Sequence, residues 1–274
     1  MRHALLAAAA ATVLLGTAAQ AAPQTDCKPQ AVLDLQRLSP EGHNVYKAAT
    51  DKSFFLRWIT CDDIQLGLAT AVHETVHMLT EEKDAYVLID GSTIKRDHSW
   101  SKFYPPREIA RRFNSASTYV ETYLKPGAAS SAQDFVFLLD EMNAYTHDLN
   151  SVIKLQTVKK GEGQVDHRDG LTALMAFLTA YFDTAKQSKP ATWQGLQKPE
   201  TKNVIKALWG QAESVLASSC GVPGIGMDDR KYIGFMCDAK NNGALGDLLG
   251  RPAACATACL SPATSASSGS STVQ

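Results

Sequence analysis

The sequence predicts a mostly α-helical α+β fold. Apolar residues recur at helical spacing in several long segments, whereas only a few short segments have the composition of β-strands. Without its leader the chain has about 250 residues, enough for one large domain or for two lobes around a cleft. We therefore expect one long helix beside a small antiparallel sheet or hairpin.

The N-terminus resembles a secretory signal peptide. Residues 1–3 carry positive charge, residues 4–15 are an apolar run, and residues 19–21 read Ala-Gln-Ala, a cleavage signature. This predicts a signal peptide over residues 1–22, too short to be a membrane span, and a secreted or periplasmic protein. No later segment is apolar for long enough to cross a bilayer, so we expect no membrane span after cleavage.

The rest of the chain divides into a folded domain over residues 23–260 and a Ser/Ala/Thr-rich tail over residues 261–274, which we expect to be disordered. The chain has 27 Lys and Arg residues against 28 Asp and Glu residues. This near-neutral balance argues against nucleic acid or an anionic membrane as the main partner.

All six cysteines lie after the leader. An even number in an exported protein predicts disulfides, and we expect neighbouring pairs: Cys27–Cys61, Cys220–Cys237 and Cys255–Cys259. The alternative is a second metal site built from thiolates, which the irregular spacing and the lack of a C-x-x-C motif disfavour.

The first part of the domain combines one strand, one helix and one hairpin. Residues 54–59 (FFLRWI) are aromatic and apolar and predict a strand. Thr60, with Asp63 three residues later, should cap a helix that runs from about Asp62 to Thr80. The segment Tyr86–Lys95 then predicts a β-hairpin, because Asp90-Gly91 is a favoured two-residue turn.

The remainder predicts four helices and their connections. A helix should open at Pro105-Pro106 and stop at Pro126-Gly127. Ser131 and Asp134 resemble a capping box for a helix that reaches about Leu155. Helical spacing returns over residues 171–185 and 204–215, with a loop at 159–170, a linker at 188–199, and mostly loop after Cys220.

The sequence HETVH in the first long helix has the spacing of a metal site. His73 and His77 are four residues apart, so both imidazoles lie on one helical face and can reach one ion. Glu74 lies one step round the helix, where it can face a water at the metal without being a ligand. These are the parts that catalytic zinc needs, with Glu74 as general base. The simpler alternative is a pair of surface histidines.

Catalytic zinc usually takes a third protein ligand. The extended motif H-E-x-x-H-x-x-G-x-x-H is absent, because Thr80 and Lys83 replace its glycine and its last histidine. Glu141 is the best candidate, since it shares the apolar face of a later helix, where a carboxylate is costly unless it is paired or bound to metal. The alternatives for this ligand are Asp140, His98 and His147.

The HETVH motif followed by a glutamate on a later helix resembles the gluzincin branch of the zincin metallopeptidases. The resemblance covers two helices and implies a Zn²⁺ ion held by His73, His77 and Glu141, with Glu74 as the base that activates water for hydrolysis of a peptide or protein substrate. The family pattern has an acidic residue four positions after the glutamate, where this chain has Tyr145. The partner that orients a zinc histidine therefore remains open.

Other functions remain compatible with the sequence. The donors for a developing oxyanion would be Tyr145, His98 or His147, and none is distinguished by its position. A catalytically inactive zinc-binding or interaction protein stabilised by disulfides is the main alternative, although such a protein has no use for Glu74. A disulfide-bonded helical module without metal is the third possibility.

Overall fold

The computed structural model describes residues 26–127, 129–163 and 167–260. Within these ranges helices predominate, and the strands form one two-stranded antiparallel sheet. The predicted mostly helical α+β class is therefore confirmed. The predicted signal peptide (1–22) and low-complexity tail (261–274) lie outside the described residues.

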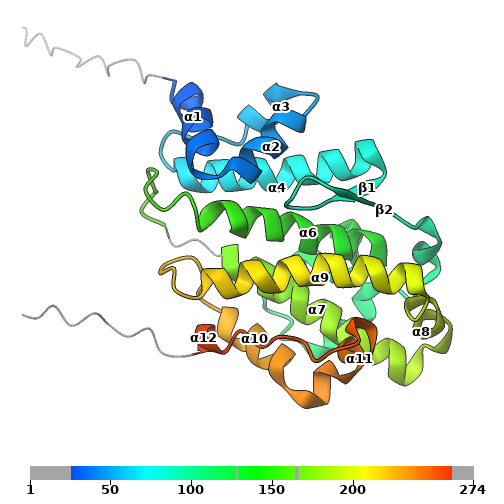
Figure 1. Cartoon of the computed structure of the whole chain (residues 1–274). Coiled ribbons are helices and arrows are strands. Elements are labelled where there is room, and N and C mark those ends of the chain that lie inside the picture. Colours follow the sequence, from blue (N-terminus) through cyan, green and yellow to red (C-terminus); the bar gives the residue numbers. More distant parts are fainter. Residues whose placement is uncertain (1–25, 128, 164–166, 261–274) are drawn as a thin grey trace, which may run out of the picture.

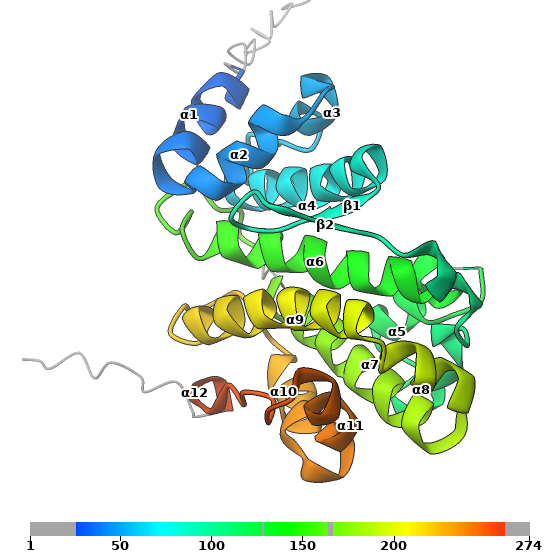
Figure 2. The same ribbon diagram turned by 45° about the vertical axis from the view of Figure 1, so that its right-hand side comes forward.

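The helices are stacked in layers (Figures 1 and 2), with α4 (Ile64–Lys83) and α6 (Phe135–Val152) side by side in the middle. On the far side of α4 lie three N-terminal helices: α1 (Lys28–Leu38), α2 (Pro40–Ala48) and α3 (Lys52–Leu56). On the other side of α6 lie the C-terminal helices: α7 (His167–Ser188), α8 (Pro190–Leu196), α9 (Pro199–Ser219), α10 (Asp229–Cys237), α11 (Ala239–Leu249) and α12 (Thr257–Leu260).

Two apolar clusters form the core. The larger one joins α6, α7, α9, α10 and α11, and the smaller one joins α1 to α4 with the inner face of the hairpin. Helix α6 lies between them, so 15 of its 18 residues are buried. Most polar residues of this helix are shielded from bulk water, and each of these needs a partner within the protein.

The strand predicted over residues 54–59 is wrong, because the chain forms helix α3 over Lys52–Leu56. Asp51 caps this helix by accepting a hydrogen bond from the Ser53 N–H at 2.8 Å. Phe55 is fully buried and packs edge-on against Tyr46, with ring centroids 5.0 Å apart. The cap and this one buried ring outweigh the β-propensity of the aromatic run.

Helix α4 begins at Ile64 and is capped by Asp63, which accepts a hydrogen bond from the Leu66 N–H at 2.9 Å. Thr60 does not cap it, because its hydroxyl donates to the Asp63 carbonyl instead. The helix continues past Thr80 and ends at Asp84, whose φ of 48° is left-handed. Both histidines of HETVH thus lie well inside a continuous helix.

The predicted hairpin is confirmed as β1 (Ala85–Val87) paired with β2 (Thr93–Lys95), but its turn differs. The Gly91 N–H donates to the Leu88 carbonyl at 2.9 Å, and only Gly91 of the Asp90-Gly91 pair has positive φ. The connection is therefore a turn followed by one left-handed residue, rather than a two-residue turn with two such residues.

The long helix predicted between Pro105-Pro106 and Pro126-Gly127 is interrupted. It consists of the 3₁₀ segment η2 (Pro106–Arg112) and the short helix α5 (Thr118–Tyr123), preceded by η1 (His98–Lys102). Between the two, the Asn114 side chain accepts a hydrogen bond from the Ala116 N–H, which gives the backbone an alternative to the helix.

Helix α6 follows the 3₁₀ turn η3 (Ser130–Ala132) and is capped by Asp134, which accepts from the Val136 N–H at 2.9 Å. The predicted capping box is wrong in its first residue, because Ser131 donates to the Tyr123 carbonyl. The prediction also missed α1, α2, α8, α10, α11 and α12. Pro190 and Pro199 open helices α8 and α9 at a position where proline is tolerated, so they do not mark a linker.

The Cys27–Cys61 disulfide is confirmed, but the other two predicted pairs are wrong. The structure pairs Cys220 with Cys259 and Cys237 with Cys255, with Cα atoms 4.6 and 5.5 Å apart. Cys220 directly follows α9, whereas Cys237 is the last residue of α10, so a loop and a helix separate the two. All six cysteines are paired, which leaves no thiolates for a second metal site.

Mass spectrometry of the unreduced protein, digested between the cysteines, should find these three pairs and no free thiol. We expect removal of the Cys220–Cys259 bridge by a double Cys→Ala substitution to cost about 2–5 kcal/mol of unfolding free energy. The matched control is Cys27→Ala with Cys61→Ala, which removes the N-terminal disulfide and keeps both disulfides of the C-terminal helices. A Cys220–Cys237 linked peptide would contradict the observed pairing.

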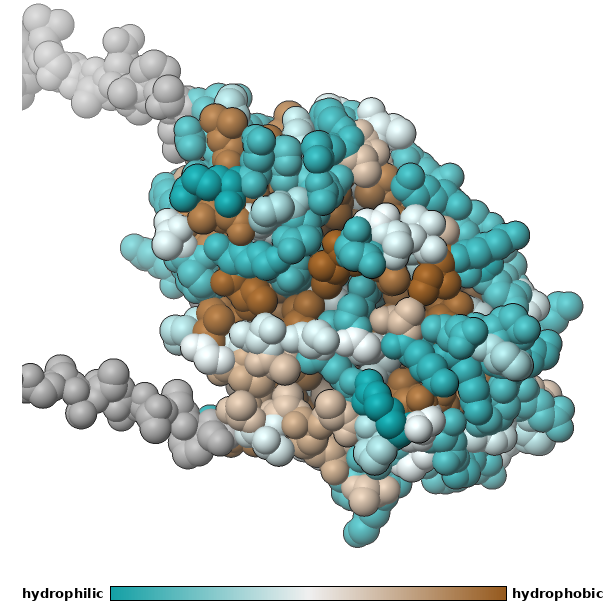
Figure 3. Space-filling view, in the orientation of Figure 1, coloured by the Kyte–Doolittle hydropathy of each residue, from teal (hydrophilic) through white to brown (hydrophobic). Residues whose placement is uncertain are grey.

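Among the described residues, no helix combines the length and the apolar character needed to span a bilayer. Apolar side chains do reach the surface between α6 and α9 and beside the hairpin (Figure 3). Two hollows of about 450 and 470 Å³ lie there, and both are lined by Leu88 and Ile89.

Candidate metal centre

Helices α4 and α6 bring three potential ligand atoms together. The Nε2 atoms of His73 and His77 are 3.2 Å apart, and Glu141 Oε2 lies 3.8 Å from the first and 3.4 Å from the second. His73 is buried, whereas 25% of the His77 side chain and 15% of the Glu141 side chain are exposed. The three predicted ligands therefore form one group that could hold a metal ion.

The spacing of these atoms fits a small cation. Ligands about 2.0–2.1 Å from a tetrahedral ion are about 3.3 Å from one another, close to the three separations seen here. Two imidazole nitrogens that face each other at 3.2 Å need either a shared proton or a shared cation between them. The group also retains an exposed side, so a further ligand or substrate can approach it.

Asp140 holds the second histidine of the group. Its Oδ2 lies 2.6 Å from His77 Nδ1, which leaves Nε2 directed at His73 and Glu141. Burial opposes a positive charge on His77, but the hydrogen bonds with Asp140 and Glu141 outweigh this and raise its pKa to about 10. Two carboxylates that stabilise a proton on His77 also favour a metal cation at the same place.

His73 has different surroundings. Burial, with smaller contributions from neighbouring histidines, holds its pKa well below the usual value, so its imidazole ring is neutral. Tyr145 packs edge-on against its ring, with centroids 4.6 Å apart. Asp148 Oδ2 lies 3.8 Å from His73 Nδ1, on the side away from the other two ligand atoms.

Asp148 also holds a histidine that sequence reasoning missed. Its Oδ1 lies 2.5 Å from His167 Nδ1, and both side chains are buried. His167 is the first residue of α7 and comes directly after residues 164–166, which lie outside the description. One carboxylate of α6 thus stands between a histidine of the metal group and a histidine of another helix.

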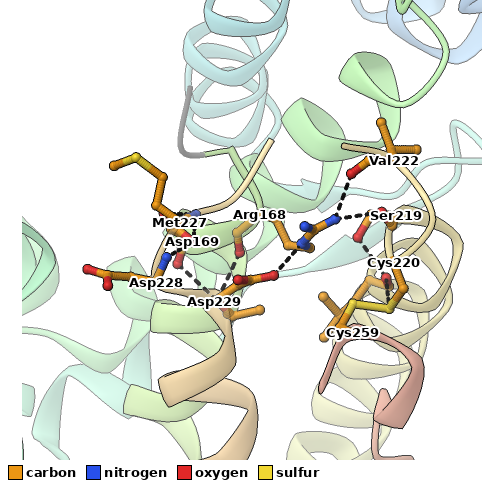
Figure 4. Close-up of polar contacts among 11 residues, drawn as sticks. Arg168, Asp169, Ser219, Cys220, Val222, Met227, Asp228, Asp229 and Cys259 are labelled. Carbon is orange, nitrogen blue, oxygen red and sulfur yellow. Dashed lines mark hydrogen bonds and ion pairs between the residues drawn. A yellow bond between two sulfur atoms is a disulfide. The ribbon is translucent and has the colours of Figure 1, made fainter. Parts of the chain in front are cut away.

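The first turn of α7 is fixed by the residues that follow His167 (Figure 4). Arg168 donates to the carbonyl of Ser219, the last residue of α9, at 2.6 Å, and it pairs with Asp229, the first residue of α10. Asp169 accepts hydrogen bonds from the Met227 and Asp228 N–H groups at 2.9 Å. The disulfide-bonded C-terminal helices thereby hold His167 in place.

A pocket of about 170 Å³ opens beside the metal group. Its walls come from four helices and consist of Leu66, Thr70, His73, Glu74, Tyr123, Tyr145, Asp148 and His167. Glu74 is half-buried there, and burial raises its pKa, with His77 lowering and Glu141 raising it further. The two larger hollows beside the hairpin are not lined by any residue of the metal group, whereas this smaller pocket is lined by His73.

Two of the histidines considered from sequence lie elsewhere. His98 is 62% exposed and contacts Asp84 at 2.6 Å, and His147 is buried with Nε2 2.9 Å from the Val87 carbonyl. Neither belongs to the metal group or lines this pocket. Of the predicted oxyanion donors only Tyr145 lines the pocket, and its hydroxyl is 2.8 Å from that of Tyr123.

Comparison of the chain with models of protein families, with curated protein sequences and with solved structures finds no match. What the group does is therefore inferred from its own geometry and chemistry.

Asp140→Asn should weaken metal binding by about 10–100-fold, because the amide no longer carries the charge that orients and polarises His77. The affinity can be measured by competition with a chromogenic chelator. The matched control is Asp134→Asn on the same helix, where asparagine also caps and the affinity should not change. Equal affinities in the two variants would show that Asp140 has no such role.

Gly170→Ala should destabilise the protein by about 1–3 kcal/mol, because a Cβ there would overlap the Tyr145 ring that packs on His73. Gly210→Ala in α9 is the control: its Cβ meets no atom, so helix propensity alone should add about 0.5–1 kcal/mol of stability. Denaturant unfolding measures both. A stabilised Gly170→Ala variant would mean that Tyr145 can move without cost.

Proposed function

We propose that this protein is an exported zinc metallopeptidase. The observation that supports it is the convergence of His73 Nε2, His77 Nε2 and Glu141 Oε2, with Glu74 in the adjoining pocket. Two imidazoles and one carboxylate are the ligand set of many catalytic zinc sites, and harder ions prefer oxygen ligands alone. Export is supported by the three disulfides, which persist in oxidising compartments.

In this proposal His73, His77 and Glu141 hold the ion, and zinc supplies a Lewis acid that polarises a peptide carbonyl and acidifies water. Glu74 takes the proton of the attacking water on a carboxylate oxygen and later gives it to the nitrogen of the leaving amine.

The pocket also supplies hydrogen-bond donors for the oxygen of the attacked carbonyl. The hydroxyls of Tyr123 and Tyr145 form one pair, and His167, held at Nδ1 by Asp148, lines the same pocket. Asp140 contacts Nδ1 of His77 and so orients its ring. In the proposed site Asp140 takes the role of the acidic residue of the family pattern, at whose position this chain has Tyr145.

The test is to measure metal content and peptide hydrolysis on the same purified protein. We expect about one zinc ion per chain, hydrolysis of a mixed peptide library, and loss of activity with a chelator that returning zinc reverses. Zinc without hydrolysis would favour the inactive binding protein, and a protein without affinity for any divalent metal would favour the helical module.

A further inference from the structure

The metal group and its pocket carry an excess of negative charge. Four carboxylates surround the site: Glu74, Asp140, Glu141 and Asp148. One divalent ion neutralises only part of this charge, and among the described residues neither lysine nor arginine lines the pocket. The field in the pocket therefore favours a positively charged group and opposes a carboxylate.

The walls of the pocket also suit the aliphatic stem of a lysine or arginine side chain. Leu66, Thr70 and Glu74 follow each other at four-residue spacing along one stripe of α4. Leu66 is 39% exposed at one end of this stripe, and Tyr123 and Tyr145 also line the pocket. An aliphatic stem can lie against Leu66, while aromatic rings and carboxylates deeper in the pocket stabilise a cation.

We propose that this pocket is a subsite for a cationic group of the substrate, next to the bond that is cleaved. This inference rests on the proposed peptidase function and gives it a substrate class: peptides with a lysine or arginine side chain, or a free N-terminal amine, at that position. Asp148 and Glu74 provide the charge, and Leu66 is the specificity-determining residue at the rim. Peptides with an acidic residue there are poor substrates.

The test compares three blocked peptides of the form acetyl-Ala-Ala-Xaa-Ala-Ala-amide, in which Xaa is lysine, norleucine or glutamate. Norleucine keeps the stem of lysine without its charge. We expect kcat/KM to fall by about tenfold from lysine to norleucine and by about tenfold again to glutamate, with the first difference shrinking as salt rises. The same series without the acetyl group shows whether the cation is the side chain or the N-terminal amine.

A charge placed at the rim of the pocket should change the ranking of the three peptides by kcat/KM. Leu66→Lys adds a cation at an exposed position, so it should reduce the preference for lysine and raise the rate with glutamate. Leu33→Lys is the matched control, because Leu33 is 56% exposed on α1 and does not line the pocket. The Leu33→Lys variant should prefer the lysine peptide as strongly as the wild-type protein does.

Norleucine cleaved as well as lysine, or glutamate cleaved as well as norleucine, would overturn the subsite. If the zinc-loaded protein cleaves none of the peptides, the peptidase function fails, and the subsite is then decided by calorimetric binding of the same three peptides. Tighter binding of the lysine peptide, weakened by Leu66→Lys and not by Leu33→Lys, would support it. Equal binding of all three would exclude it.

Discussion

Replacing Glu74 with glutamine should leave the metal bound and lower peptide hydrolysis by about a hundred- to ten-thousand-fold. Glutamine keeps the size and the helix preference of glutamate, so α4 should form unchanged. It has no basic carboxylate to take a proton from water. Because Glu74 in this pocket would also position that water, we expect the loss at the upper end of the range or beyond it.

The comparison needs equal zinc occupancy in the two proteins, since Glu74 is not a ligand in the proposed site. Glu82→Gln is the matched control: Glu82 lies on the same helix, is exposed, and only accepts a hydrogen bond from Thr50. Its activity should equal that of the wild-type protein. Equal turnover by the Glu74→Gln variant would show that Glu74 is not the base. Zinc binding without turnover in every variant would identify a binding protein.

The part of the site that could be predicted from sequence is the part set by helical spacing. His73 and His77 are neighbours on any helix, and Glu141 could be singled out because a carboxylate on an apolar face needs a partner. Each of these two inferences needs only the spacing of residues along a single helix. The structure brings the three residues together because α4 and α6 pack side by side.

The site residues that the sequence did not reveal are brought into the site by the packing of different helices. Asp140 appears on the polar side of α6, yet that side faces His77 of α4, so the carboxylate is buried and paired. Asp148 and His167 belong to different helices, and no periodicity relates α6 to the start of α7. The position of His167 depends on the contacts of Arg168 and Asp169, which anchor the first turn of α7.

The errors in secondary structure have a related cause. Residues 54–59 have the composition of a strand, but the cap at Asp51 and the buried Phe55 favour a short helix. The sequence predicts a linker at 188–199, but its Pro190 and Pro199 lie in the first turn of α8 and α9, where proline is well placed. Short segments are decided by caps and tertiary contacts, whereas long periodic segments such as α7 and α9 are decided by their pattern.

Replacing both His73 and His77 with alanine should abolish metal binding, from about one zinc ion per chain to none. A single carboxylate, Glu141, would remain of the three ligands, and one oxygen ligand does not hold zinc at ordinary concentrations. Metal analysis after gel filtration measures the stoichiometry. His98→Ala is the control, because His98 is exposed and contacts Asp84 outside the group, so the ion should remain bound.

Thermal unfolding separates loss of the metal from damage to the fold. The double variant leaves the buried Asp140 without its partner and opens space beside Tyr145, so it should be less stable even without zinc. In the wild-type protein, free zinc at about a thousand times its Kd should add about 4 kcal/mol, which a chelator removes. We therefore expect the chelator to lower the Tm of the wild-type and His98→Ala proteins and to leave that of the double variant unchanged. Unchanged stoichiometry, or an equal chelator effect in all three, would rule out His73 and His77 as ligands.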